Sequence, residues 1–75
     1  MAEETLDLTG LKCPLPALMA RRALARLAPG QAITVITTDP LAVLDIPHMC
    51  GEEGHGLESV AIQEGRSLFR IRAKA

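Results

Sequence analysis

The chain has 75 residues, of which 48% are hydrophobic, and a formal net charge of −1. This length suits one domain, because a second could not bury enough apolar surface, so residues 1–75 are expected to form a single domain that folds without a metal. The weak charge and the single aromatic residue, Phe69, lack the basic field and the stacking platforms typical of nucleic-acid binding, so no direct nucleic-acid partner is expected.

The N-terminal sequence and the cysteine content indicate a cytoplasmic protein. The segment "MAEETLDLTG" has no basic start and no apolar core of a signal peptide, and no stretch approaches the roughly 20 apolar residues that span a bilayer. Cys13 and Cys50 form no CxxC pair, and the histidines lack metal-ligand spacing, so no zinc site is expected. Cytoplasmic thiols are kept reduced, which favours a reactive or a packed cysteine over a disulfide.

The first half of the chain predicts a strand, a helix and a second strand. "TLDLTG" alternates apolar and polar side chains as a half-buried strand does, and Gly10 ends it. A helix is expected over residues 16–27, ended by "APGQ" with Gly30 as a left-handed cap. The β-branched run "AITVITT" is typical of a central strand, and the helical crossover makes the two strands parallel. The helix stripe expected to face the core comprises Ala17, Ala20, Leu24 and Leu27.

The second half predicts a helix followed by a hairpin. Asp39 and Asp45 each precede a proline and suit helix N-caps, so a short turn and then a helix over about residues 46–54 are expected. His48 should face solvent and His55 should close this helix. "LESVAIQ" and "SLFRIRA" alternate in polarity around "EGR", which is typical of an antiparallel hairpin. The residues of this helix expected in the core are Ile46, Met49 and Cys50.

These elements predict an α/β (α+β) two-layer sandwich. The order is βαβαββ, and the economical packing is a mixed four-stranded sheet with two helices on one face.

Cys13, in "GLKCPLPAL", is the candidate nucleophile. Pro14 and Pro16 suit the opening turn of a helix, which places Cys13 at or just before the helix N-terminus. The helix dipole and the neighbouring Lys12 predict a lowered pKa for the Cys13 thiol, and the thiolate is the nucleophile in sulfur transfer. The alternative is a small apolar cysteine that merely packs in a strand-to-helix turn.

The outer face of the first helix is a candidate docking surface. It is expected to expose three apolar side chains beside Cys13, together with two arginines that would steer acidic partners. The alternative is the ordinary scatter of single exposed leucines found on most proteins. The docking residues are Leu15, Leu18, Met19, Arg22 and Arg26.

The sequence resembles the TusA family of small sulfur-carrier proteins over nearly its whole length. "LDLTGLKCPLP" is similar to the family's first strand and Cys-Pro-x-Pro signature, "ALARLAPGQAITVITTDP" to its first helix and second strand, and "DIPHMC" with a following "GH" to its second helix. Many members have arginine where this chain has Thr9, which bears on the choice of partner. The motif positions around the cysteine are Gly10, Lys12, Pro14 and Pro16.

The resemblance implies a sulfur carrier that is as much a shuttle as an enzyme. Cys13 would hold sulfane sulfur as a transient persulfide, taken from a cysteine desulfurase or a rhodanese-like protein and passed to an acceptor protein, with no other cofactor. Family members serve tRNA thiolation, molybdenum-cofactor synthesis or sulfur oxidation. Two alternative functions are a non-catalytic interaction module, in which Cys13 is incidental, and a redox switch based on Cys13. Cys50 is either a core residue or a resolving thiol, and a monomer is expected.

Overall fold

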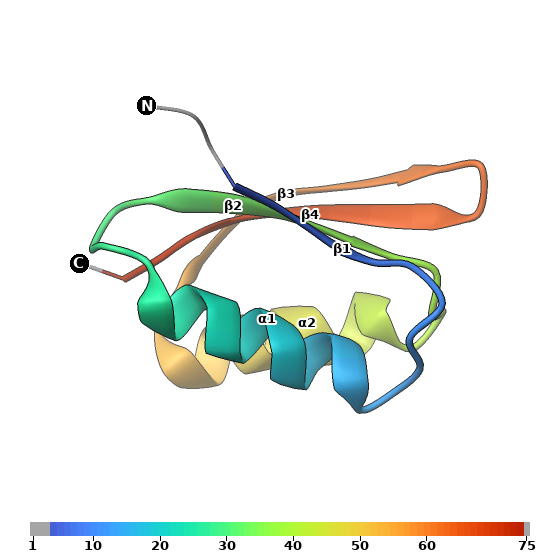
Figure 1. Ribbon diagram of the computed structural model, residues 1–75, viewed down its shortest axis with the longest axis horizontal. Coiled ribbons are helices and arrows are strands. Elements are labelled where there is room, and N and C mark those ends of the chain that lie inside the picture. Colours follow the sequence, from blue (N-terminus) through green and yellow to red (C-terminus); the bar gives the residue numbers. More distant parts are fainter. Residues whose placement is uncertain (1–3, 75) are drawn as a thin grey trace.

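The computed structural model describes residues 4–74; residues 1–3 and 75, the ends of the predicted domain, lie outside the described residues. The elements follow the predicted βαβαββ order, and both helices cover one face of the sheet, which confirms the two-layer sandwich (Figure 1). Within residues 4–74, no helix has the length and apolar character needed to cross a membrane. The elements are β1 (Glu4–Leu8), α1 (Leu15–Arg26), β2 (Ala32–Thr37), α2 (Ala42–Glu53), β3 (Gly56–Gln63) and β4 (Arg66–Arg72).

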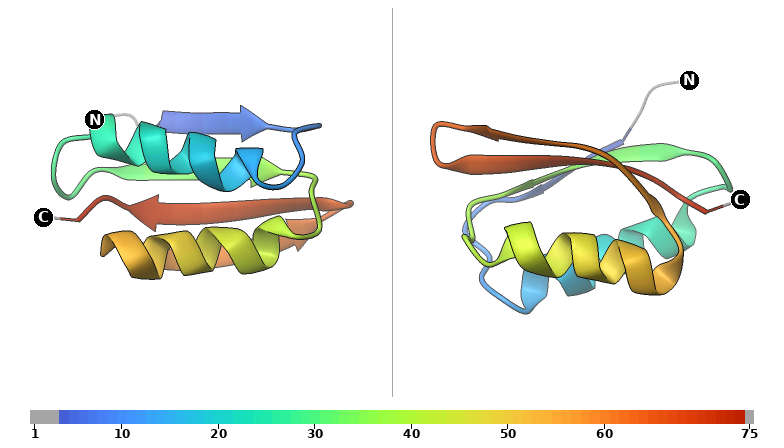
Figure 2. Two further views of the ribbon diagram at one scale, coloured as in Figure 1. Left: turned by 90° about the horizontal axis from the view of Figure 1, so that it is seen from below. Right: turned by 180° about the vertical axis from the view of Figure 1, so that it is seen from behind.

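The sheet is mixed, with the strand order β1-β2-β4-β3. β1 pairs with β2 in parallel, and β4 lies antiparallel to both β2 and β3. β1 and β2 point the same way, and both helices begin at the end of the molecule where these strands finish (Figure 2). The loops that follow β1 and β2 therefore meet at one end of the sheet, as the carboxyl ends of neighbouring parallel strands do.

The core lies between the helices and the central strands. Phe69 and Ile71 of β4 and Ile33 and Val35 of β2 are almost completely buried, since every second residue of these strands faces the helices. The predicted helix stripe faces the core: Ala20 and Leu24 are buried, and Ala17 and Leu27 are partly buried and pack against the core. The residues that α1 buries are Pro16, Ala20, Ala23 and Leu24.

The second helix begins earlier than predicted. α2 starts at Ala42 rather than near Ile46, and Pro47 lies inside it instead of in its first turn. Ala42 and Ile46 are both essentially inaccessible to solvent, and burying this extra turn outweighs the single backbone hydrogen bond that Pro47 cannot donate. The predicted burial of Ile46, Met49 and Cys50 is confirmed.

The glycines, rather than the residues beside them, carry the left-handed backbone at the helix ends. Gly54 caps α2 with a φ of 82°, and the His55 N–H donates to the Cys50 carbonyl at 2.9 Å, so His55 helps to close this helix as predicted; its Nδ1 accepts a further hydrogen bond from the Lys74 N–H. Gly30 has the predicted positive φ, but it lies in the loop beyond α1, whose C-cap is the extended Leu27.

Candidate functional site

Cys13 lies exposed in the loop between β1 and α1. Pro14, joined to it by a cis peptide bond, is the N-cap of α1, and Pro16 is the second helical residue, so Cys13 directly precedes the helix as predicted. Gly10 turns the chain after β1 with a φ of 87°, a backbone conformation that favours glycine. Its N–H donates to Thr38 Oγ1 at 2.9 Å, which fastens the loop to the end of β2.

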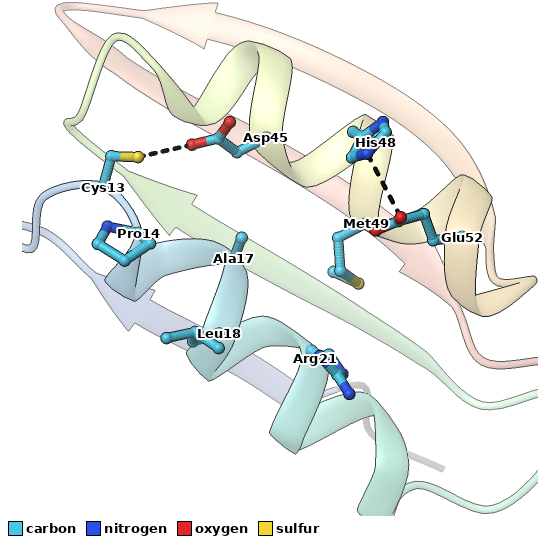
Figure 3. A pocket seen from close by; sticks show the side chains of 9 residues that line it. All are labelled: Cys13, Pro14, Ala17, Leu18, Arg21, Asp45, His48, Met49 and Glu52. Atoms are coloured by element: carbon cyan, nitrogen blue, oxygen red, sulfur yellow. Dashed lines mark hydrogen bonds and ion pairs between the residues drawn. The ribbon is translucent and has the colours of Figure 1, made fainter.

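Two aspartates from the β2–α2 region hold Cys13. The Cys13 N–H donates to Asp39 Oδ2 at 2.9 Å, and the Cys13 thiol donates to Asp45 Oδ2 at 2.9 Å (Figure 3). The prediction that these aspartates cap helices is wrong, because the N-cap of α2 is Leu41 and no side chain makes a capping hydrogen bond there. The carboxylates instead bind a residue 26 and 32 positions earlier in the chain.

The structure reverses the predicted direction of the Cys13 pKa. The hydrogen bond to Asp45, partial loss of solvent, and the negative charges of Asp45 and Asp39 together raise the pKa of the Cys13 thiol above its usual value. A thiol that donates to a carboxylate loses this bond and gains charge repulsion when it ionises. In the resting protein Cys13 is therefore a protonated thiol rather than a thiolate.

The helix N-terminus does not offset the aspartates, because it has few free donors. Pro14 and Pro16 carry no N–H, and the Leu15 N–H already donates to the Lys12 carbonyl at 2.8 Å. The prolines that place Cys13 at the helix start thus also remove the amide groups that would stabilise a thiolate there. Lys12 is exposed and does not lower the pKa of Cys13, so its predicted cationic effect on the thiol is not found.

Alkylation of Cys13 by iodoacetamide is expected to accelerate with pH beyond the usual range for a free thiol. Only the thiolate reacts, and a raised pKa lowers the thiolate fraction at every pH below it, so the rate should level off only above this raised pKa. Measuring the second-order rate across pH by intact mass tests this. A rate that is already constant near neutral pH would contradict the raised pKa.

A groove of about 280 Å³ runs between α1 and α2, with Cys13 at one end. In Figure 3 the labelled side chains of α1 and α2 lie along this groove, and Cys13 points toward Asp45 at its head. Most of the surface that lines the groove is apolar, as is common for binding clefts. The lining residues are Cys13, Pro14, Ala17, Leu18, Arg21, Asp45, His48, Met49 and Glu52.

The predicted docking residues are exposed, but only one lines the groove. Leu15 and Leu18 are each 46% exposed and Met19 is 38% exposed, which confirms an apolar outer face on α1. Arg22 and Arg26 are also exposed. Of the five residues, Leu18 reaches the groove, whereas the arginine at the groove is Arg21, which sequence analysis missed although it follows Ala17 by one helical turn.

Two other titratable residues singled out in the sequence, Cys50 and His48, make no hydrogen bond to Cys13. Cys50 is 3% exposed in the core, which confirms the packed reading, and burial raises the pKa of its thiol. His48 faces solvent as predicted and pairs with Glu52 one turn later, with 3.5 Å between Nε2 and Oε2. Across residues 4–74, no three side chains of the types that ligate metals are gathered into a possible metal site.

Comparison with known proteins identifies the family. Residues 4–73 match the family described as "Sulfurtransferase TusA". The chain belongs to the TusA family. The match spans both loops that meet at Cys13, so the aspartates as well as the cysteine lie inside the region that defines the family.

Similar proteins have nearly the same length. A Neisseria meningitidis protein named as a candidate sulfur carrier is 48% identical and covers 99% of this chain and 100% of its own. The sulfur carrier protein TusA of Pseudomonas entomophila is 42% identical over 97% of this chain and 91% of its own. The crystal structure of a SirA-like protein from Desulfitobacterium hafniense superimposes with a TM-score of 0.81 at 28% identity, over 95% of this chain and 97% of that one. The fold is therefore the TusA fold.

Proposed function

We propose that this protein carries sulfane sulfur as a persulfide on Cys13, between a donor protein and an acceptor protein. The observation that carries the proposal is the position of Cys13 in a TusA-family chain: it is the exposed cysteine of the pair, at the head of a groove between two helices. The other cysteine, Cys50, is enclosed by the core and is not accessible to a protein partner.

Loading is a thiol exchange in which no net oxidation occurs. The Cys13 sulfur attacks the outer sulfur of the donor persulfide, and the bond between the two donor sulfurs breaks. The bonding electron pair leaves with the inner donor sulfur, which takes up a proton and becomes the donor thiol. The proton lost by Cys13 balances the proton gained by the donor.

Unloading repeats these steps with the roles exchanged. An acceptor cysteine attacks the outer sulfur of the Cys13 persulfide, and the Cys13 sulfur leaves with the electron pair and regains a proton. The acceptor becomes the persulfide and Cys13 returns to its resting thiol. Both transfers need an exposed Cys13, and neither needs a metal or an organic cofactor.

The partners are proposed from the resemblance and from the exposed surface of α1. A cysteine desulfurase or a rhodanese-like protein supplies sulfur, and a protein cysteine accepts it for tRNA thiolation, cofactor synthesis or sulfur oxidation. The exposed side chains beside Cys13 are those of Leu15, Leu18 and Met19. A donor or acceptor protein must contact this surface, because its reacting sulfur has to come within bonding distance of the Cys13 sulfur. The carrier acts in the cytoplasm as a monomer.

The test is the intact mass of the protein after incubation with a cysteine desulfurase and cysteine, or with a rhodanese and thiosulfate. A gain of one sulfur atom that reductant removes is expected. The Cys50→Ala variant should show the same gain, because Cys50 is buried. Absence of the gain with both donors, or its loss in Cys50→Ala with the fold intact, would refute sulfur carriage on Cys13.

A further inference from the structure

Resting on the proposed function, we propose that Asp45 is the proton shuttle of sulfur transfer: its carboxylate takes the Cys13 proton during loading and returns it during unloading. The carrying observation is geometric. Asp45 Oδ2 lies 2.9 Å from Cys13 Sγ and accepts its hydrogen bond at the head of the groove (Figure 3). This is the distance at which a general base removes a proton.

A protonated thiol makes a base necessary at the moment of attack. The surroundings of Cys13 raise the pKa of its thiol, so spontaneous ionisation supplies little thiolate near neutral pH. A carboxylate is a weaker base than a thiolate, and Asp45 therefore leaves Cys13 protonated at rest. As the new sulfur–sulfur bond draws electrons from the Cys13 sulfur, its proton becomes acidic enough to move to the carboxylate.

In both transfers, the Asp45 side chain takes up the proton that is released and gives it to the sulfur that leaves. In loading, the Cys13 proton passes to Asp45 as the bond to the outer sulfur forms, and then to the departing donor thiolate, which is a stronger base than the carboxylate. In unloading, the acceptor thiol gives its proton to Asp45, which protonates the departing Cys13 sulfur. Asp45 ends each transfer as it began, as a carboxylate.

Asp39 provides the contrast within the same site. Its Oδ2 accepts the Cys13 backbone N–H at 2.9 Å, and its charge also raises the thiol pKa, but no hydrogen bond joins it to the sulfur. Asp39 therefore positions the loop and suppresses ionisation, whereas Asp45 is placed to move the proton. His48, which also lines the groove, pairs with Glu52 rather than with Cys13.

The experiment compares two reactions of Cys13 in the Asp45→Asn variant. Alkylation by iodoacetamide reports only the thiolate fraction, since iodide leaves without a proton, and removing the Asp45 charge should shift its pH profile to lower pH. Sulfur loading from a desulfurase needs the proton transfer and should slow by about 10²-fold near neutral pH. The amide still accepts the thiol hydrogen bond but cannot take the proton.

The pH dependence of loading separates proton transfer from positioning. Without the shuttle, loading relies on thiolate formed by solvent, so the ratio of the Asp45→Asn rate to the wild-type rate should rise between about pH 6 and pH 8. Taking this ratio at each pH cancels the titration of the donor. A variant that only misplaces Cys13 would be slow by the same factor at every pH.

Two further variants serve as matched comparisons. Asp39→Asn should shift alkylation to lower pH as Asp45→Asn does, but should accelerate loading, because it adds thiolate and keeps the shuttle. Glu64→Gln removes a carboxylate from the turn between β3 and β4, which is not among the groups that raise the pKa of the Cys13 thiol, and should leave both reactions at wild-type rates.

The outcomes distinguish this inference from the proposed function. If the wild-type protein loads and Asp45→Asn loads equally fast or faster, the shuttle is refuted while sulfur carriage stands. If the slowing is constant across pH, the shuttle is likewise refuted. If the wild-type protein does not load at all, the proposed function fails and this inference with it.

Discussion

Replacing Cys13 with serine is expected to abolish sulfur loading completely while leaving the fold unchanged. The side chain is exposed and contributes nothing to the core, and a serine hydroxyl can still donate to Asp45 Oδ2. Serine has no sulfur that could hold a persulfide. Intact mass after incubation with a desulfurase and cysteine should therefore show no gain in Cys13→Ser, and circular dichroism should match the wild type.

The Cys50→Ala variant is the matched control for this loss, since it removes the other thiol of the chain. If Cys13→Ser still shows a reductant-labile mass gain, the transferred sulfur must be bound to Cys50. Because Cys50 is 3% exposed, this would require α2 to open during transfer. That result would exclude Cys13 as the carrier residue.

Replacing Phe69 with alanine is expected to destabilise the protein by about 3–5 kcal/mol, the usual cost of emptying a buried aromatic site. Phe69 is fully buried in β4, the strand that pairs with both β2 and β3. A domain of 75 residues has a total free energy of unfolding of about 4–11 kcal/mol, so the variant should be close to unfolding at room temperature. Urea denaturation followed by circular dichroism measures the change.

Ile62→Ala provides the comparison for Phe69→Ala, because Ile62 is 70% exposed on the neighbouring strand β3. Its expected change is within about 0.5 kcal/mol, as for most surface substitutions. Equal losses in the two variants would mean that stability does not follow the burial seen in the structure.

The fold could be predicted from the sequence because local patterns and the global packing agree. Alternation in "TLDLTG" and "AITVITT", with a helical stripe between them, indicates two parallel strands and a crossover, and the structure confirms this arrangement. The start of α2 could not be predicted in the same way. Proline and aspartate signals pointed to residue 46, but burial of Ala42 with Ile46 extends the helix toward the N-terminus against those signals.

The site was predicted only in part, because sequence neighbours do not reveal contacts between loops. The position of Cys13 before a helix follows from Pro14 and Pro16, but its pKa depends on Asp39 and Asp45, which are far from it in the chain. One signal was available: both aspartates follow the second of two parallel strands, and Cys13 follows the first. Their carboxyl ends share one edge, where polar groups from different loops gather.

The outermost strand of the hairpin bears on how this protein behaves in concentrated solution. β3 lies at the edge of the sheet, and its Val60 and Ile62 are 44% and 70% exposed, so its unpaired backbone is a template on which a strand of another molecule could add. The pairing of β3 with β4 is irregular between Leu57 and Ser59, and such an irregularity bends and twists the strand away from a straight edge. The bulge therefore makes this edge a less regular partner for an added strand than a straight β3 would be.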